Sequence, residues 1–169
     1  MNSVDQSSLG HAASAADIQV VSDQLGRPAR DIVGVTARCV CGNPVVVATK
    51  PRLHDGTPFP TLYYLTQTAA TQAASRLEAE GLMAGYQERL ETDEDAKNAY
   101  LKAHQSYLST RESIEHVEEI AGISAGGMPD RVKCLHALMA HSLSVGPGVN
   151  PVGDWALSDT PWSVEICHC

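Results

Sequence analysis

The stretch DIVGVTARCVCGNPVVVATK, residues 31–50, decides the fold of this chain. It holds two apolar, β-branched runs, 31–40 and 44–50, separated by the short sequence Cys-Gly-Asn. Such runs favour strands, and a Gly-Asn pair between them favours a tight turn. The stretch therefore predicts a β-hairpin with Cys39 and Cys41 at its tip.

The segments after the hairpin predict an α+β fold. Residues 62–66, LYYLT, have the composition of a third strand. The remainder is mostly helical: a long helix is expected over about 93–120 with Asp93 as its N-cap, and another begins at Pro129. A small antiparallel β-sheet, the hairpin plus a third strand, should therefore pack against several α-helices.

The length of 169 residues supports one compact domain. Residues 1–13 are polar and predict a flexible N-terminal tail, whereas Ser14 can cap a first helix. We therefore expect a single domain over residues 14–169.

The charge of the chain argues against several classes of partner. Twelve basic and 20 acidic residues give a net charge of −8, whereas nucleic-acid binding needs clustered Lys and Arg. No apolar run approaches the roughly 20 residues of a membrane span, and the first residues lack the pattern of a signal peptide. The acidic runs at 91–95 and 115–119 are typical of solvated helix faces. We expect a cytoplasmic protein that binds neither nucleic acid nor membrane.

The five cysteines are the most chemically informative residues. In a reducing compartment they are thiols or metal ligands rather than a disulfide framework. Side chains one residue apart on a strand point to opposite faces, but at a turn both Cys39 and Cys41 can reach one ion. The chain ends on the same spacing at Cys167 and Cys169. The alternative is that the thiols are small buried hydrophobic groups.

Basic and aromatic groups form a second pattern, on the long helix and before the next one. Tyr100, His104, Tyr107 and Arg111 recur at steps of four, three and four, so they share one helix face, which either braces the core or lines a pocket. A Gly-Gly loop ahead of a predicted helix N-terminus can hold an anion. The candidate anion-binding residues are Arg38, Arg76, His104, Arg111, Gly126, Gly127, Lys133 and His136.

Several long strings make the chain resemble a known family. They include RCVCGNPVVV, PRLHDGTPFPTLYYLT, SAGGMPDRVKCLHALMAHSL and GPGVNPVGD. From about residue 15 to the end, the chain resembles the DUF501 family, a bacterial group of unknown function. The resemblance implies a gene neighbourhood with a septum-formation initiator, enolase and an exopolyphosphatase, but no reaction.

The resemblance also implies a set of metal ligands. The family's CxCG matches Cys39 and Cys41, its KCLH matches Cys134, and its C-terminal cysteine matches Cys167, which leaves Cys169 as a spare thiol. Four thiolates suit zinc or an iron–sulfur cluster. In one departure, Gln67 stands where the resemblance leads us to expect a cysteine.

These patterns favour two functions. The first is a metal-binding protein that also binds a small anion or phosphate compound. Because Cys134 and His136 lie about 160° apart on a helix, we do not expect these two residues to form a local chelate. The alternative is a non-catalytic partner protein linked to cell division or envelope synthesis. The sequence names no reaction and no oligomeric state.

Overall fold

The hairpin predicted over residues 31–50 forms most of the sheet. The computed structural model describes residues 6–169, and in it β1 (Ile32–Arg38) pairs antiparallel with β2 (Pro44–Thr49), which pairs antiparallel with β3 (Tyr63–Leu65). The strand order is β1-β2-β3. The predicted α+β class and the third strand are confirmed.

Helices make up most of the remaining ordered chain. They are α1 (Ala15–Leu25), α2 (Thr68–Ala79), α3 (Leu82–Thr92), α4 (Glu94–Glu112), α5 (Leu135–Val145) and α6 (Pro151–Ser158), with 3-10 turns η1 (Gln6–Leu9) and η2 (Glu118–Ile120). Within residues 6–169, none of them combines the length and apolar character that a membrane crossing requires. Side-chain caps at Ser14, Asp93 and Asn150 begin α1, α4 and α6.

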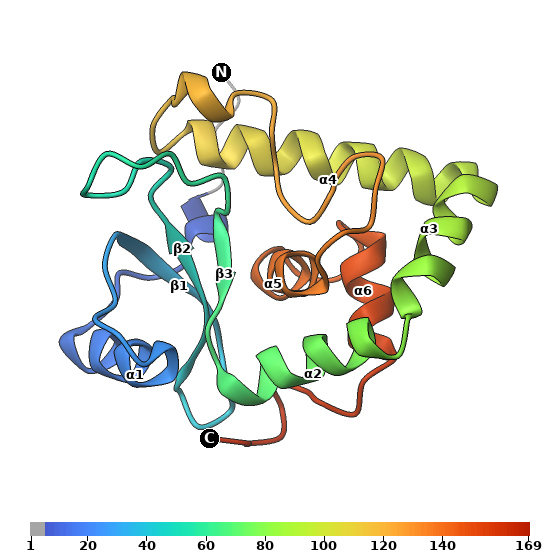
Figure 1. Ribbon diagram of the computed structural model, residues 1–169. Coiled ribbons are helices and arrows are strands. Elements are labelled where there is room, and N and C mark those ends of the chain that lie inside the picture. The colour runs from blue at the N-terminus through green and yellow to red at the C-terminus, as the bar shows by residue number, and fades with distance from the viewer. Residues whose placement is uncertain (1–5) are drawn as a thin grey trace.

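The helices cover both faces of the sheet (Figure 1). Helix α1 lies on one face, where Val21 packs with Val35 and Val47. Helix α5 lies on the other face and is itself surrounded by α2, α4 and α6. Strand β2 is therefore buried along its whole length between two layers of helix.

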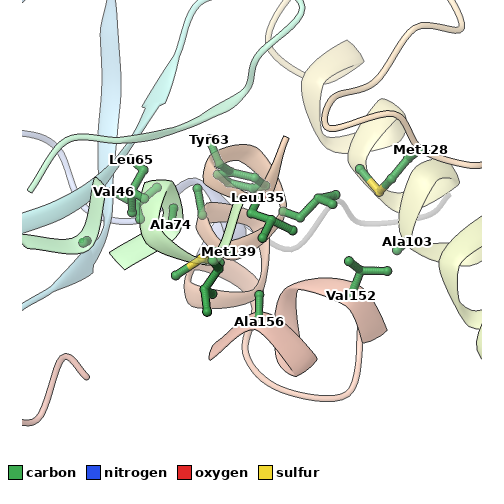
Figure 2. Packing of buried hydrophobic residues seen from close by; sticks show 14 of the residues in the cluster. Val46, Tyr63, Leu65, Ala74, Ala103, Met128, Leu135, Met139, Val152 and Ala156 are labelled. Carbon is green, nitrogen blue, oxygen red and sulfur yellow. The ribbon is translucent and has the colours of Figure 1, made fainter. Parts of the chain in front are cut away.

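The main core gathers around α5 (Figure 2). Leu135, Leu138 and Met139 of this helix are fully buried against strand β3 and helices α2 and α6. Each such side chain contributes about 2 kcal/mol through apolar burial. This core therefore fixes the first residue of α5 beside helix α2.

Two predicted helix boundaries were wrong. The helix expected over 93–120 ends at Glu112, because the chain turns back so that Val117 and Ile120 become buried. The helix expected from Pro129 begins only at Leu135. Before it, the carbonyl of Arg131 accepts a hydrogen bond from the hydroxyl of Tyr100 and is not available to a helix.

The predicted N-terminal tail is partly packed. Residues 1–5 lie outside the described residues, but His11 forms a bridge with Val35 of β1. Gly10 approaches the same strand so closely that a Cβ atom there would lie 1.9 Å from the Val35 carbonyl oxygen. Within residues 6–13, the η1 turn therefore lies against β1, and His11 adds a single bridge to the edge of the sheet.

The polar-aromatic face of α4 braces loops. The hydroxyl of Tyr107 accepts a hydrogen bond from the Leu62 backbone N–H at 2.6 Å. The buried guanidinium of Arg111 donates to the carbonyl oxygens of Pro60, Ile120 and Ile123 at 2.6–2.8 Å. Arg111 therefore holds three separate chain segments together, and burial lowers the pKa of its guanidinium.

Another buried polar group lies at the centre of the core. His141 stacks on Tyr63 and meets Tyr107 edge-on, and its Nδ1 accepts a hydrogen bond from Asn150. Within residues 6–169 its Nε2 has no hydrogen-bond partner. Burial lowers the pKa of this ring from 6.5 to about 4, so His141 is neutral at pH 7.

We predict that Arg111→Met lowers the free energy of unfolding by about 3 kcal/mol, because three carbonyl groups lose their charged donor. Urea unfolding measures the change. The exposed Lys102 on the same helix provides the control Lys102→Met, which should have little effect. Equal stability of the two variants would contradict this role.

We also predict an acid-dependent loss of stability that depends on His141. Below about pH 6.5 the unfolded chain protonates this ring, whereas the native protein does so only below about 4. The free energy of unfolding should therefore fall as pH falls from 6.5 to 4, by up to about 3 kcal/mol. In His141→Phe this part of the slope should disappear, whereas His11→Gln at an exposed position should retain it.

Candidate metal centre

The turn of the β1–β2 hairpin presents two thiols on one side. The Gly42 N–H donates to the Cys39 carbonyl at 2.7 Å, and Cys39 N–H donates to the Asn43 carbonyl at 2.9 Å. Gly42 has φ +93°, a left-handed conformation that glycine adopts without strain. This tight turn ends the strand alternation, so that Cys41 does not point away from Cys39.

An ion pair fixes the turn to the first helix. The guanidinium of Arg38 donates to both carboxylate oxygens of Asp17 at 2.7 and 2.9 Å and to the Gly42 carbonyl at 2.9 Å. The Arg38 hydrogen bonds hold the pKa of the Asp17 carboxyl well below its usual range. Arg38 therefore positions the hairpin turn by way of α1.

The C-terminal tail returns to the same turn (Figure 1). Trp162 is buried, and its indole N–H donates to the Gln67 side-chain oxygen at 3.0 Å. The Val40 N–H then donates to the Val164 carbonyl at 2.8 Å. These two anchors bring Cys167 and Cys169 to the hairpin tip.

The sulfur atoms of four cysteines lie close together at the hairpin tip. The Sγ atoms of Cys39, Cys41, Cys167 and Cys169 all lie within 4.8 Å of one another, and those of Cys41 and Cys169 are 3.6 Å apart. Cys39 is buried, whereas the other three cysteines are exposed. Such a cluster is compatible with binding of one metal ion.

The structure departs from the predicted ligand set at two cysteines. It brings together Cys39, Cys41 and Cys167 as expected, but the fourth sulfur is that of Cys169 rather than that of Cys134. Cys134 lies apart from this cluster, beside Glu78 and His136. The reason is that Cys134 precedes α5, whose burial against α2 directs it away from the hairpin tip.

The neighbouring groups favour deprotonated sulfur at Cys39. Burial alone would raise the pKa of the Cys39 thiol, but hydrogen bonds from the Cys41 N–H and the adjacent thiols lower it to about 7. Burial raises the pKa of Cys169. A thiolate is the form that binds metal, so the lowered pKa favours Cys39 as a ligand.

Gln67 lies directly against the cluster. Its side-chain N–H donates to the Cys169 sulfur at 3.1 Å, while its oxygen accepts from Trp162. The residue is buried and precedes α2. Gln67 thus occupies the edge of the thiol cluster, where it contacts a sulfur rather than contributing one.

A second cluster of donor atoms surrounds His136. Its Nδ1 lies 3.1 Å from Glu78 Oε1 and 4.0 Å from Cys134 Sγ, and its Nε2 lies 3.1 Å from Ser75 Oγ. Interaction with Cys134, aided by the charge of Glu78, raises the pKa of the His136 ring to about 9 against the effect of burial. His136 in turn lowers the pKa of the Cys134 thiol.

The expectation that Cys134 and His136 face apart was therefore wrong. It assumed helical geometry at both residues, but Cys134 is the N-cap of α5 with extended φ and ψ of −148° and 107°. An extended residue brings its side chain alongside that of the residue two positions later on the first helical turn.

Four of the basic groups proposed for an anion pocket have separate partners. Arg38 pairs with Asp17, Arg111 with three carbonyl groups, His104 with Ser124, and His136 with Glu78. The carbonyl groups of Gly126 and Gly127 accept from the N–H groups of Lys133 and Arg131 at 2.8 Å, in a turn that precedes no helix directly. Arg76 lies near Gln72 and Thr160 beside the tail.

Sequence reasoning missed Cys169, Glu78 and Ser75. A signal for Cys169 was present, since its spacing from Cys167 repeats that of the hairpin pair. The spacing of Ser75 and Glu78 places both on one face of α2, but nothing in the sequence indicates that this face meets the start of α5.

Comparison with known proteins gives a family and no activity. The DUF501 family model, described as a protein of unknown function, matches residues 35–158. This chain therefore belongs to the DUF501 family. Searches of curated proteins and of solved structures found no match.

Proposed function

Starting from a family of unknown function, we propose that this protein binds one zinc ion through Cys39, Cys41, Cys167 and Cys169. The observation that carries the proposal is the convergence of four sulfur atoms from two chain segments far apart in sequence. Four thiols, of which Cys39 is buried and the other three are exposed, have little other reason to share one point, because thiols are weak hydrogen-bonding partners for one another.

The spacing of the sulfur atoms favours a single ion over an iron–sulfur cluster. Sulfur atoms at 2.3 Å from a tetrahedral zinc ion lie about 3.8 Å apart. The separations here, 3.6 Å for one pair and at most 4.8 Å for any, need a contraction of about 1 Å or less. A cluster places several iron and sulfide ions between the thiolates and needs more room.

The donor set points to a structural role for this ion. Four thiolates fill a tetrahedral shell, and closed shells of this type stabilise folds rather than activate water. The ion would attach the C-terminal tail to the hairpin tip and so complete the cover over α2 and the sheet. The predicted anion pocket finds no support in the separate partners of its residues.

We predict that Cys41→Ser and Cys169→Ser each remove one equivalent of zinc per chain from natively purified protein. Elemental analysis by mass spectrometry measures the metal content. The loss should lower the melting temperature and expose the tail after Trp162 to proteolysis, because metal binding contributes directly to folding free energy. A colourless protein without absorbance near 400 nm would agree with zinc.

The matched control is Cys134→Ser, which removes a thiol outside the cluster. In that variant the four cluster thiols should still resist alkylation until a chelator is added, as judged by peptide mass mapping. The proposal would be overturned if Cys41→Ser had the same zinc content, melting temperature and resistance to alkylation as the wild type.

We further predict that Gln67→Glu weakens zinc binding at this cluster by about 10- to 100-fold, as loss of outer-shell partners does elsewhere. The variant keeps an oxygen for the Trp162 indole but replaces the N–H donor to Cys169 with a negative charge. Competition with a chromophoric chelator measures the affinity. Gln72→Glu adds the same charge at an exposed position on α2 and should leave the affinity unchanged.

A further inference from the structure

We propose a second metal site, formed by Cys134, Glu78 and His136, that binds a divalent transition metal such as zinc with an open coordination position. Three different donor atoms, Sγ, Oε1 and Nδ1, lie within 4.8 Å of one another. They come from the last turn of α2 and from the start of α5, two elements that the core packs together.

The separations fit a shared ion. Zinc bonds of 2.0–2.3 Å at tetrahedral angles place N and O ligands about 3.4 Å apart and S and N ligands about 3.6 Å apart. The observed values are 3.1 Å for Nδ1 to Oε1 and 4.0 Å for Nδ1 to Sγ. The third pair, Oε1 and Sγ, lies within 4.8 Å, so shifts of about 1 Å or less in each of these partly exposed side chains would bring all three onto one ion.

The outer contacts already hold the ligands in place. In the neutral ring, Ser75 Oγ can accept the Nε2 proton of His136, so that the Nδ1 lone pair faces Cys134 and Glu78. The Leu135 N–H donates to Glu78 Oε1 at 2.8 Å. Partners of this kind on the second ring nitrogen and on the carboxylate are typical of metal ligands.

The same geometry argues against a cysteine nucleophile with a histidine base. In such a system one ring nitrogen faces the nucleophile and the other faces the orienting carboxylate. Here Nδ1 faces both the thiol and the carboxylate, and Nε2 faces Ser75. An ion bound by the thiol and the carboxylate together would require this arrangement, in which both groups face the same nitrogen.

A hollow gives this site access to a further ligand. Cys134 and His136 line a depression of about 380 Å³ together with Thr61, Tyr63, Tyr64, Leu65, Thr71 and Ala137. Three protein ligands with room for water or substrate characterise catalytic zinc sites, in contrast to the closed set of four thiols. A metal here would polarise an oxygen donor, such as a bound water or a carbonyl or phosphoryl oxygen, that enters through the hollow.

The test measures metal at the two sites separately in the full-length chain. We expect wild-type protein to bind two zinc equivalents, and Cys134→Ser and Glu78→Gln to bind one while their four cluster thiols still resist alkylation. Ser75→Ala should keep the second site but weaken it by about 10- to 100-fold. Ser109→Ala, at an exposed helix position, is the matched control and should bind as the wild type does.

Cobalt provides the readout for the open position. In the cobalt-loaded protein, azide should change the visible spectrum, and the change should be absent in Cys134→Ser. Wild-type protein that binds a single equivalent, unaffected by Cys134→Ser and Glu78→Gln, would overturn this second site and leave the zinc cluster standing. One equivalent lost in Cys134→Ser but retained in Cys41→Ser would support the second site and refute the cluster.

Discussion

The burial of β2 on both faces is the constraint on which the rest of the structure depends. A strand with Val45, Val46 and Val47 almost wholly inaccessible must be covered by a layer on each side. Helix α1 supplies one layer and α5 the other, and α5 is then enclosed by α2, α4 and α6 (Figure 1). Both candidate metal sites lie where this layering ends: one at the turn that leads into β2, and one where α5 begins beside α2.

The parts of the fold that depend on local chemistry could be read from the sequence. The hairpin follows from β-branched runs around Gly42, and the starts of α1, α4 and α6 follow from the side chains of Ser14, Asp93 and Asn150. The errors arose where distant contacts decide the outcome. Helix α4 ends early because Val117 and Ile120 turn back to the core, and the stretch before α5 stays irregular because Tyr100 engages the Arg131 carbonyl.

The same distinction explains the candidate site. Cys39 and Cys41 could be identified from the sequence as a pair of possible ligands, because a single local turn brings both thiols together. The choice between Cys134 and Cys169 as the fourth sulfur depended on where the tail runs, which is fixed by the Trp162–Gln67 and Val40–Val164 hydrogen bonds. Neither bond has a local sequence signal. Gln67 links these features, since one amide group anchors the tail through its oxygen and contacts the cluster through its nitrogen.

The two donor sets differ in their number of protein ligands, and this difference favours different roles. Four thiolates would complete the coordination of a tetrahedral ion and leave no position for a substrate, so we propose that the first set holds the tail in place. The Cys134, Glu78 and His136 set is incomplete and opens on a hollow lined by tyrosine and threonine side chains of the β3 region. Strand β3 and the first residues of α5 pack into the central core, so that set lies directly beside the core. We propose that chemistry takes place at the incomplete donor set beside the hollow, whereas a metal ion in the closed thiol cluster would stabilise the surrounding fold.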